Sequence, residues 1–319
     1  MILSPEVLTL FILNALFAFF ALIAFVLSVK IFLKWDTNAT DQTQYQLEKQ
    51  SFLSATIIKY IFIIKVPLFL FFIFTMDKIS GILPGAMCAA GVVDATAYGV
   101  YLILLKILNL YIFAYWLVLH NEDMKHETQP YTKMKFGLFI VAFFLLMSEI
   151  VLEWVMFSAI DIQKVVDCCG VIYSSTTSSY ISMLFRIQTP LLLAAFYGNF
   201  ALIVLFYFLR KKEIFALFNA TFIIISLITL ISFFGTYIYE LPTHRCPFCF
   251  LQKEYHYVGY VLYIFLFIGT FYGLVTGFVK ASKSDVYRSY RVSMLFTFLY
   301  VVLLSIYPLF YYIKNGVWL

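Results

Sequence analysis

The residues best suited to chemistry lie in one short stretch, 243–260, between two long apolar runs. Its sequence, THRCPFCFLQKEYHYVGY, holds a Cys-x-x-Cys pair, two histidines, two cations, one acid and three tyrosines. Two thiols at this spacing can form and break a disulfide, and thiols with histidine can bind a soft metal ion. We therefore treat this stretch as the candidate functional site.

The thiols Cys246 and Cys249 are expected at the start of a helix. Proline is favoured at the first helical position, so Pro247 predicts Cys246 near the N-cap and Cys249 near the third position. The partial positive charge of a helix N-terminus stabilises a thiolate, and the cations Arg245 and Lys253 strengthen that field. The pattern predicts a disulfide-exchange pair, with a structural disulfide as the alternative.

Three further cysteines lie outside this stretch. Cys168 and Cys169 are adjacent, and adjacent cysteines rarely bond each other because the small ring strains the peptide between them. Cys88 is the natural candidate for pairing with one of them. Such a pair could be catalytic, or it could be a cross-link that only braces two outer loops. A total of five cysteines leaves one outside any stable pair.

The composition indicates the class of protein that must position these residues. Of 319 residues, 63% are hydrophobic and only 12% are charged, and the mean hydropathy is +0.94. Soluble domains carry roughly 25% charged residues, so this chain is expected to be a polytopic membrane protein in contact with lipid. The net charge of +5 does not indicate nucleic-acid binding, because its cations lie in short segments between apolar runs.

A membrane-spanning helix needs about 20 apolar residues, and eight segments meet that requirement. We expect an all-α bundle of about eight transmembrane helices in a single domain, residues 1–319, with the first apolar run retained as a span. The predicted spans are residues 6–33, 55–76, 95–119, 136–160, 188–209, 214–238, 258–279 and 292–313.

The distribution of Lys and Arg predicts the orientation of these spans. One set of alternate connections carries thirteen of these cations and the other, with the C-terminal tail, carries six. The richer set is expected in the cytoplasm. All five cysteines then fall on the outer side, where disulfides persist. We expect a bacterial inner (cytoplasmic) membrane, with the cysteines facing its extracytoplasmic side.

The run Cys-Pro-Phe-Cys-Phe-Leu-Gln-Lys, followed by an aromatic-rich span, resembles the active loop of the DsbB/BdbC family of membrane disulfide oxidases. It is also similar to the Cys-x-x-Cys entrance helix of vitamin K epoxide reductases. The resemblance covers about 20 residues and includes Lys253 four positions after Cys249. Those families are built on a core of about four spans, whereas this chain has eight.

The resemblance implies roles for several residues. Cys246 and Cys249 would pass electrons to a membrane quinone, with Lys253 as the cation beside it. A second pair, Cys88 with Cys168 or Cys169, would relay electrons to an extracytoplasmic thiol-redox protein. Tyr257 and Tyr260 could wall the quinone headgroup, although an aromatic belt at the membrane interface also explains them.

Metal binding is the competing hypothesis for the same stretch. A thiophilic ion, copper or mercury, could be held by soft and borderline ligands. The candidate ligands are Cys246, Cys249, His244, His256 and Met87. The protein would then be a transporter or binding protein for that ion. A third hypothesis is a non-catalytic integral subunit of a larger complex.

Charged residues within the predicted spans form a second candidate site. Lys106, Glu149 and Glu153 should lie at similar depths in two consecutive antiparallel spans, and Lys65 lies in the second span. A charge at the bilayer centre costs on the order of 3 kcal/mol, so such residues face inward and pair. They would form either a proton or ion route or a structural Lys106–Glu149 salt bridge.

Overall fold

The computed structural model describes residues 4–36, 41–163, 165–166, 188–278 and 283–319. These residues form helices and connections without any strand, and eight of their helices are long and apolar enough to cross a membrane. The predicted all-α class and the eight spans are therefore confirmed. The chain divides into two compact units, 1–84 with 92–164 and 85–91 with 165–319. The single domain expected from the sequence stays a prediction.

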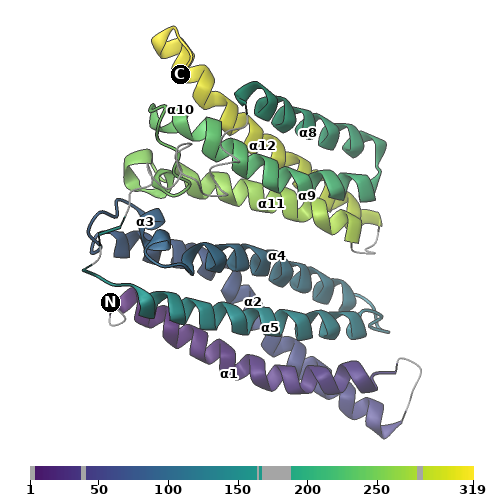
Figure 1. Cartoon of the computed structure of the whole chain (residues 1–319). Coiled ribbons are helices and arrows are strands. Elements are labelled where there is room, and N and C mark those ends of the chain that lie inside the picture. The colour runs from purple at the N-terminus through teal and green to yellow at the C-terminus, as the bar shows by residue number, and fades with distance from the viewer. Residues whose placement is uncertain (1–3, 37–40, 164, 167–187, 279–282) are drawn as a thin grey trace. The chain divides into compact units, whose positions relative to one another are not determined.

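The first unit is a ring of four long helices. They are α1 (Pro5–Lys34), α2 (Gln42–Ser80), α4 (Gly99–Asp123) and α5 (Thr132–Ala159). The short α3 (Ala89–Asp94) precedes α4, and its residues 89–91 belong to the second unit. Each long helix packs against the next, and α5 returns to α1 (Figure 1). The core between them is aromatic, since Phe62 stacks on Phe113 at a centroid distance of 4.2 Å and contacts Trp116 edge-on.

The second unit also contains four long spans in a ring. They are α8 (Thr189–Leu209), α9 (Lys212–Thr229), α11 (Val258–Phe278) and α12 (Lys283–Asn315). The helix α9 continues through a π-helical turn, η1 (Leu230–Phe234), into α10 (Gly235–Tyr239). Consecutive spans pack together, and α12 returns to α8 (Figure 1). This is the up-and-down order that short connections between helices favour.

Two helices are longer than their apolar runs predicted. The helix α2 begins at Gln42 rather than near residue 55, with Asp41 as its N-cap accepting a hydrogen bond from the Gln44 N–H at 3.2 Å. The helix α12 begins at Lys283 rather than near residue 292. Hydropathy detects only the part of a helix that lipid surrounds, whereas polar residues with good helix propensity continue the helix into water.

Asparagines within the spans join neighbouring helices. The Asn109 Nδ2 of α4 donates to the Leu145 carbonyl of α5, and the Asn199 Nδ2 of α8 donates to Thr221 Oγ1 of α9 at 2.8 Å. Ser293 of α12 donates to Asn219 Oδ1 of α9 at 3.4 Å. All three asparagines therefore take part in hydrogen bonds between helices.

Candidate functional site

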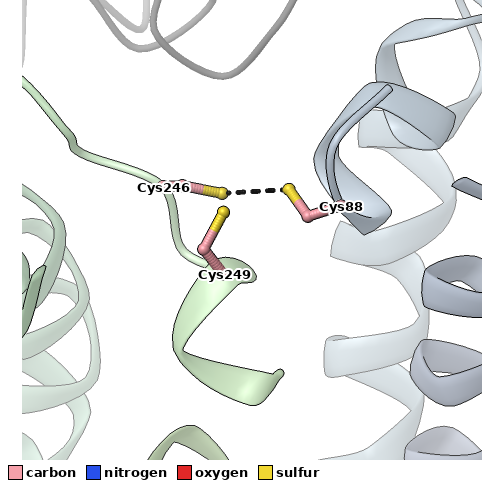
Figure 2. Close-up of side chains that lie close together, drawn as sticks. All are labelled: Cys88, Cys246 and Cys249. Carbon is pink, nitrogen blue, oxygen red and sulfur yellow. Dashed lines mark hydrogen bonds between the residues drawn. The ribbon is translucent and has the colours of Figure 1, made fainter. Parts of the chain in front are cut away.

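Three cysteine sulfurs meet in the second unit. The Sγ atoms of Cys88, Cys246 and Cys249 all lie within 4.8 Å of one another, and those of Cys88 and Cys246 are 3.4 Å apart (Figure 2). The three residues are 0%, 1% and 5% exposed. Because a disulfide bond is about 2.05 Å long, Cys88 and Cys246 are in contact but not bonded to each other. We call this group the sulfur triad.

The segment that carries Cys88 is fixed by glycine. At Gly85 the φ angle is +88°, and a Cβ there would lie 2.3 Å from the Val166 carbonyl oxygen. Only glycine therefore fits this turn. Three residues later, the Cys88 carbonyl accepts a hydrogen bond from the Gly91 N–H at 3.0 Å. The backbone thus holds Cys88 just before α3.

The segment that carries Cys246 and Cys249 does not begin a membrane-spanning helix. Cys249–Leu251 and Lys253–Tyr255 are separate 3₁₀ turns, and α11 begins only at Val258. The predicted helix start at Pro247 was wrong, because the chain turns before α11 through left-handed His256 and Tyr257, with φ of 53° and 57°. A three-residue turn supplies little dipole, so a long helix N-terminus does not activate these thiols.

Local hydrogen bonds hold the cysteine loop instead. The Phe248 N–H donates to Cys246 Sγ at 3.4 Å. The Tyr239 hydroxyl donates to the Cys246 carbonyl and accepts from the Phe250 N–H at 3.1 Å. Tyr263 of α11 donates to the Pro247 carbonyl at 2.8 Å. Two tyrosines thus anchor the loop to the bundle.

Replacing Tyr239→Phe should loosen this loop. The change leaves the buried Cys246 carbonyl and Phe250 N–H without their partner, at a cost of about 1–3 kcal/mol. We expect alkylation of Cys246 and Cys249 in reduced protein to accelerate roughly tenfold. Quantitative mass spectrometry of a timed alkylation measures this rate. The control Tyr197→Phe, which removes a partly exposed hydroxyl bonded to Ser305, should leave the rate unchanged.

His244 lies beside the triad. Its ring meets that of Tyr239 edge-on at a centroid distance of 4.3 Å, and its buried Nε2 has no hydrogen-bond partner among the described residues. Burial lowers the pKa of His244, and a negative charge on the nearby Cys88 sulfur would oppose that shift. The imidazole is therefore neutral near pH 7.

This lowered pKa predicts a pH dependence of stability. Between the folded-state pKa of His244 and its ordinary value near 6.5, the unfolded chain binds more protons, so acid favours unfolding. We expect the thermal midpoint to fall more steeply below pH 6.5 in the wild type than in His244→Gln. Thermal unfolding between pH 8 and pH 5 tests this, and parallel curves for the two proteins would refute it.

The other residues predicted for this site are not part of the triad, and two of them lie outside the described ranges. Lys253 and His256 are exposed, and Tyr257 is 52% exposed with its ring 6.4 Å from that of Tyr260. The Met87 side chain is 71% exposed, and its carbonyl accepts a hydrogen bond from Gln252. Cys168 and Cys169 lie outside the described residues. The metal-ligand group therefore contains Cys88 and neither of the two predicted histidines.

Buried charges in the first unit centre on Glu149. Its Oε1 accepts from Lys65 Nζ at 3.0 Å and from Lys106 Nζ at 2.8 Å. Its Oε2 accepts from Asn109 Nδ2 at 2.6 Å. The predicted Lys106–Glu149 ion pair is confirmed, and Lys65 is a second partner. All three charged side chains are at least 93% buried.

Asn14 closes these contacts into a ring. Glu153 accepts from Lys106 at 2.6 Å and from Asn14 Nδ2 at 2.9 Å, and Asn14 Oδ1 accepts from Lys65 at 2.8 Å. The charges of the two ammonium groups and the two carboxylates cancel, and each carboxylate oxygen accepts at least one hydrogen bond. The sequence interpretation missed Asn14, although a lone Asn within the apolar run 6–33 was a usable signal.

Comparison of the chain with protein-family models, with curated proteins and with solved structures found no match. The site must therefore be interpreted from its own residues.

Proposed function

We propose that this membrane protein is a thiol–disulfide oxidoreductase that exchanges electrons between extracytoplasmic thiols and a membrane quinone. The observation that supports it best is the sulfur triad, three buried thiol groups whose Sγ atoms lie within 4.8 Å of one another. Sulfurs at this separation can exchange disulfide partners after small side-chain rotations, because exchange requires a thiolate to approach one sulfur of a disulfide.

Cys246 is the shared sulfur in this proposal. The Cys88 thiolate attacks Cys246 Sγ of a Cys246–Cys249 disulfide, from a starting separation of 3.4 Å. The Cys88–Cys246 bond forms, the Cys246–Cys249 bond breaks, and Cys249 leaves as a thiolate. This exchange moves a disulfide without changing the number of electrons on the protein. The reverse attack by Cys249 restores the original pair.

Net oxidation of Cys246 and Cys249 releases two electrons and two protons as the disulfide forms. A bound quinone would supply the matching chemistry by accepting both electrons and both protons. A quinone would fit beside Lys253 and the rings of Tyr257 and Tyr260, because a cation and an exposed aromatic face follow the cysteines directly. Lys253 would donate a hydrogen bond to a quinone oxygen.

The architecture of the second unit is consistent with the resemblance. The triad belongs to a unit with four spans of its own, the size of the core on which the DsbB/BdbC family is built. By the Lys and Arg distribution, the cysteines face the extracytoplasmic side of a bacterial inner membrane. Cys88 would relay electrons through Cys168 or Cys169 to a soluble thiol-redox partner.

Mapping of disulfides at several redox poises tests this proposal. The purified protein is equilibrated in thiol–disulfide buffers, its thiols are trapped, and its disulfides are identified by mass spectrometry. We expect a Cys246–Cys249 disulfide that reduces readily and reforms when a quinone is added. A pair that never oxidises, or that resists strong reductant, would rule out the exchange function and leave a bracing role.

Transport or binding of copper or mercury is the second candidate, and the compactness of the triad favours it. A metal ion with three thiolate ligands at about 2.3 Å holds its sulfurs roughly 4 Å apart, close to the separation here. In this case the ion is the substrate. Titration of reduced protein with Cu(I) against a competing chelator distinguishes the two functions. Tight binding of one Cu(I) per chain that is lost in Cys88→Ser would support metal handling.

A further inference from the structure

A cavity lies in the second unit, near the end of α8, the start of α9 and the first turns of α12. It has a volume of about 460 Å³ and combines two cations with several aromatic rings. None of its residues belongs to the sulfur triad. Its lining residues are Tyr207, Phe208, Arg210, Lys212, Val286, Tyr287 and Tyr290.

Arg210 occupies a constrained position at this cavity. It ends α8 in the left-handed conformation, with φ of 55°, which costs a residue other than glycine about 1 kcal/mol. Its guanidinium lies over the Tyr287 ring at 4.8 Å from the centroid, an attractive cation–π contact. The stacking holds the planar donor group at the cavity, ready for two parallel hydrogen bonds to an anion.

Lys212 supplies a second positive charge. It is the first residue of α9, an 18-residue helix whose first amides lack partners within the helix and so add partial positive charge. In the part of the chain that the structure describes, no carboxylate forms an ion pair with Arg210 or Lys212. Among the described residues, the lining of the cavity therefore combines two positive charges with no carboxylate.

Tyr290 provides an independent indication of a ligand. It lines the cavity and is only 7% exposed, yet its buried hydroxyl has no hydrogen-bond partner among the described residues. Leaving such a group unpaired costs about 1–3 kcal/mol. A bound anion with several acceptor oxygens would pair with this hydroxyl and with both cations.

We propose that this cavity binds the phosphate of an anionic phospholipid headgroup. The source is lipid rather than a soluble phosphate because the cavity lies at the end of an apolar span. There, Phe208 is 73% exposed and Leu209 is 55% exposed, which provides a surface for an acyl chain. Basic pockets at the ends of transmembrane helices suit acidic lipid headgroups.

The test measures lipid affinity by native mass spectrometry of detergent-purified protein titrated with short-chain phosphatidylglycerol. We expect the double variant Arg210→Gln/Lys212→Gln to bind at least tenfold more weakly than the wild type. Tyr290→Phe should weaken binding about threefold to tenfold. The matched control is Lys211→Gln/Arg288→Gln, which removes the same charge from neighbouring exposed positions outside the lining, and it should bind like the wild type.

Three results would overturn the proposal. If the control variant loses as much affinity for phosphatidylglycerol as Arg210→Gln/Lys212→Gln, the effect is one of general charge. If the wild type binds phosphatidylcholine as tightly as phosphatidylglycerol, the cavity has no preference for an anion. Binding of inorganic phosphate as tight as that of phosphatidylglycerol would assign the cavity to a soluble ligand. Thermal unfolding of each variant without added lipid shows whether it is folded, and Tyr290→Phe tests the site while leaving both cations in place.

Discussion

In the Cys249→Ser variant, Cys88 and Cys246 should become bonded to each other. Their Sγ atoms are 3.4 Å apart, and removal of Cys249 takes away the competing thiol of the triad. Disulfide formation needs the two sulfurs to approach to about 2.05 Å, a shift that rotation of the Cys88 or Cys246 side chain can supply. In a mildly oxidising glutathione buffer, we expect nearly complete conversion to this cross-link.

Protease digestion followed by mass spectrometry measures this cross-link directly, because it joins peptides from residues 158 positions apart in the chain. Cys88→Ser in the Cys249→Ser background is the control and should yield no such linked peptide. If Cys246 in Cys249→Ser stays fully open to alkylation under the oxidising buffer, Cys88 is not its exchange partner. The sulfur triad would then have no role in relay.

Loss of Glu149 should destabilise the protein more than loss of any exposed carboxylate. Glu149→Gln leaves two buried ammonium groups, Lys65 and Lys106, with only Glu153 to balance them. Breaking a buried ionic group in this way costs about 3–5 kcal/mol. For a chain of this size we expect the thermal midpoint in detergent to fall by about 10 °C.

A matched control and a compensating variant separate charge from packing in this experiment. Glu127→Gln makes the same chemical change at an exposed position of the first unit and should leave the midpoint within about 1 °C. Lys65→Met combined with Glu149→Gln restores neutrality, since Lys106 and Glu153 still pair, and should recover part of the loss. Equal midpoints for Glu149→Gln and Glu127→Gln would refute the structural importance of the ring.

The helical architecture was predictable because eight apolar runs each reach membrane length. The ionic pair was predictable too, since Lys106 and Glu149 lie at similar depths on consecutive antiparallel spans. Asn14 was not predicted because it is a single neutral residue. Its importance depends on a hydrogen bond to Glu153, which lies 139 positions away in the sequence. Sequence spacing alone does not show which faces of two such helices meet.

The sulfur triad was only partly predictable. The Cys246–Cys249 pair is visible as a short motif, whereas the approach of Cys88 depends on how two connections far apart in the chain fold together. The helix expected at Pro247 failed for a local reason. Proline favours a helix start, but the extended Gln252 and left-handed His256 and Tyr257 delay α11 until Val258.

Single-turnover reduction of quinone by pre-reduced, anaerobic protein tests the proposed function most directly. We predict that wild-type protein converts at least one quinone to quinol per chain, followed by absorbance, while Cys246 and Cys249 become a disulfide. Cys246→Ser should yield no quinol. Cys168→Ser/Cys169→Ser should retain the wild-type yield, because reduction of quinone by Cys246 and Cys249 does not require electron transfer through Cys168 or Cys169. The same quinol yield from wild type and Cys246→Ser, or none from wild type, would contradict a quinone-linked sulfur triad.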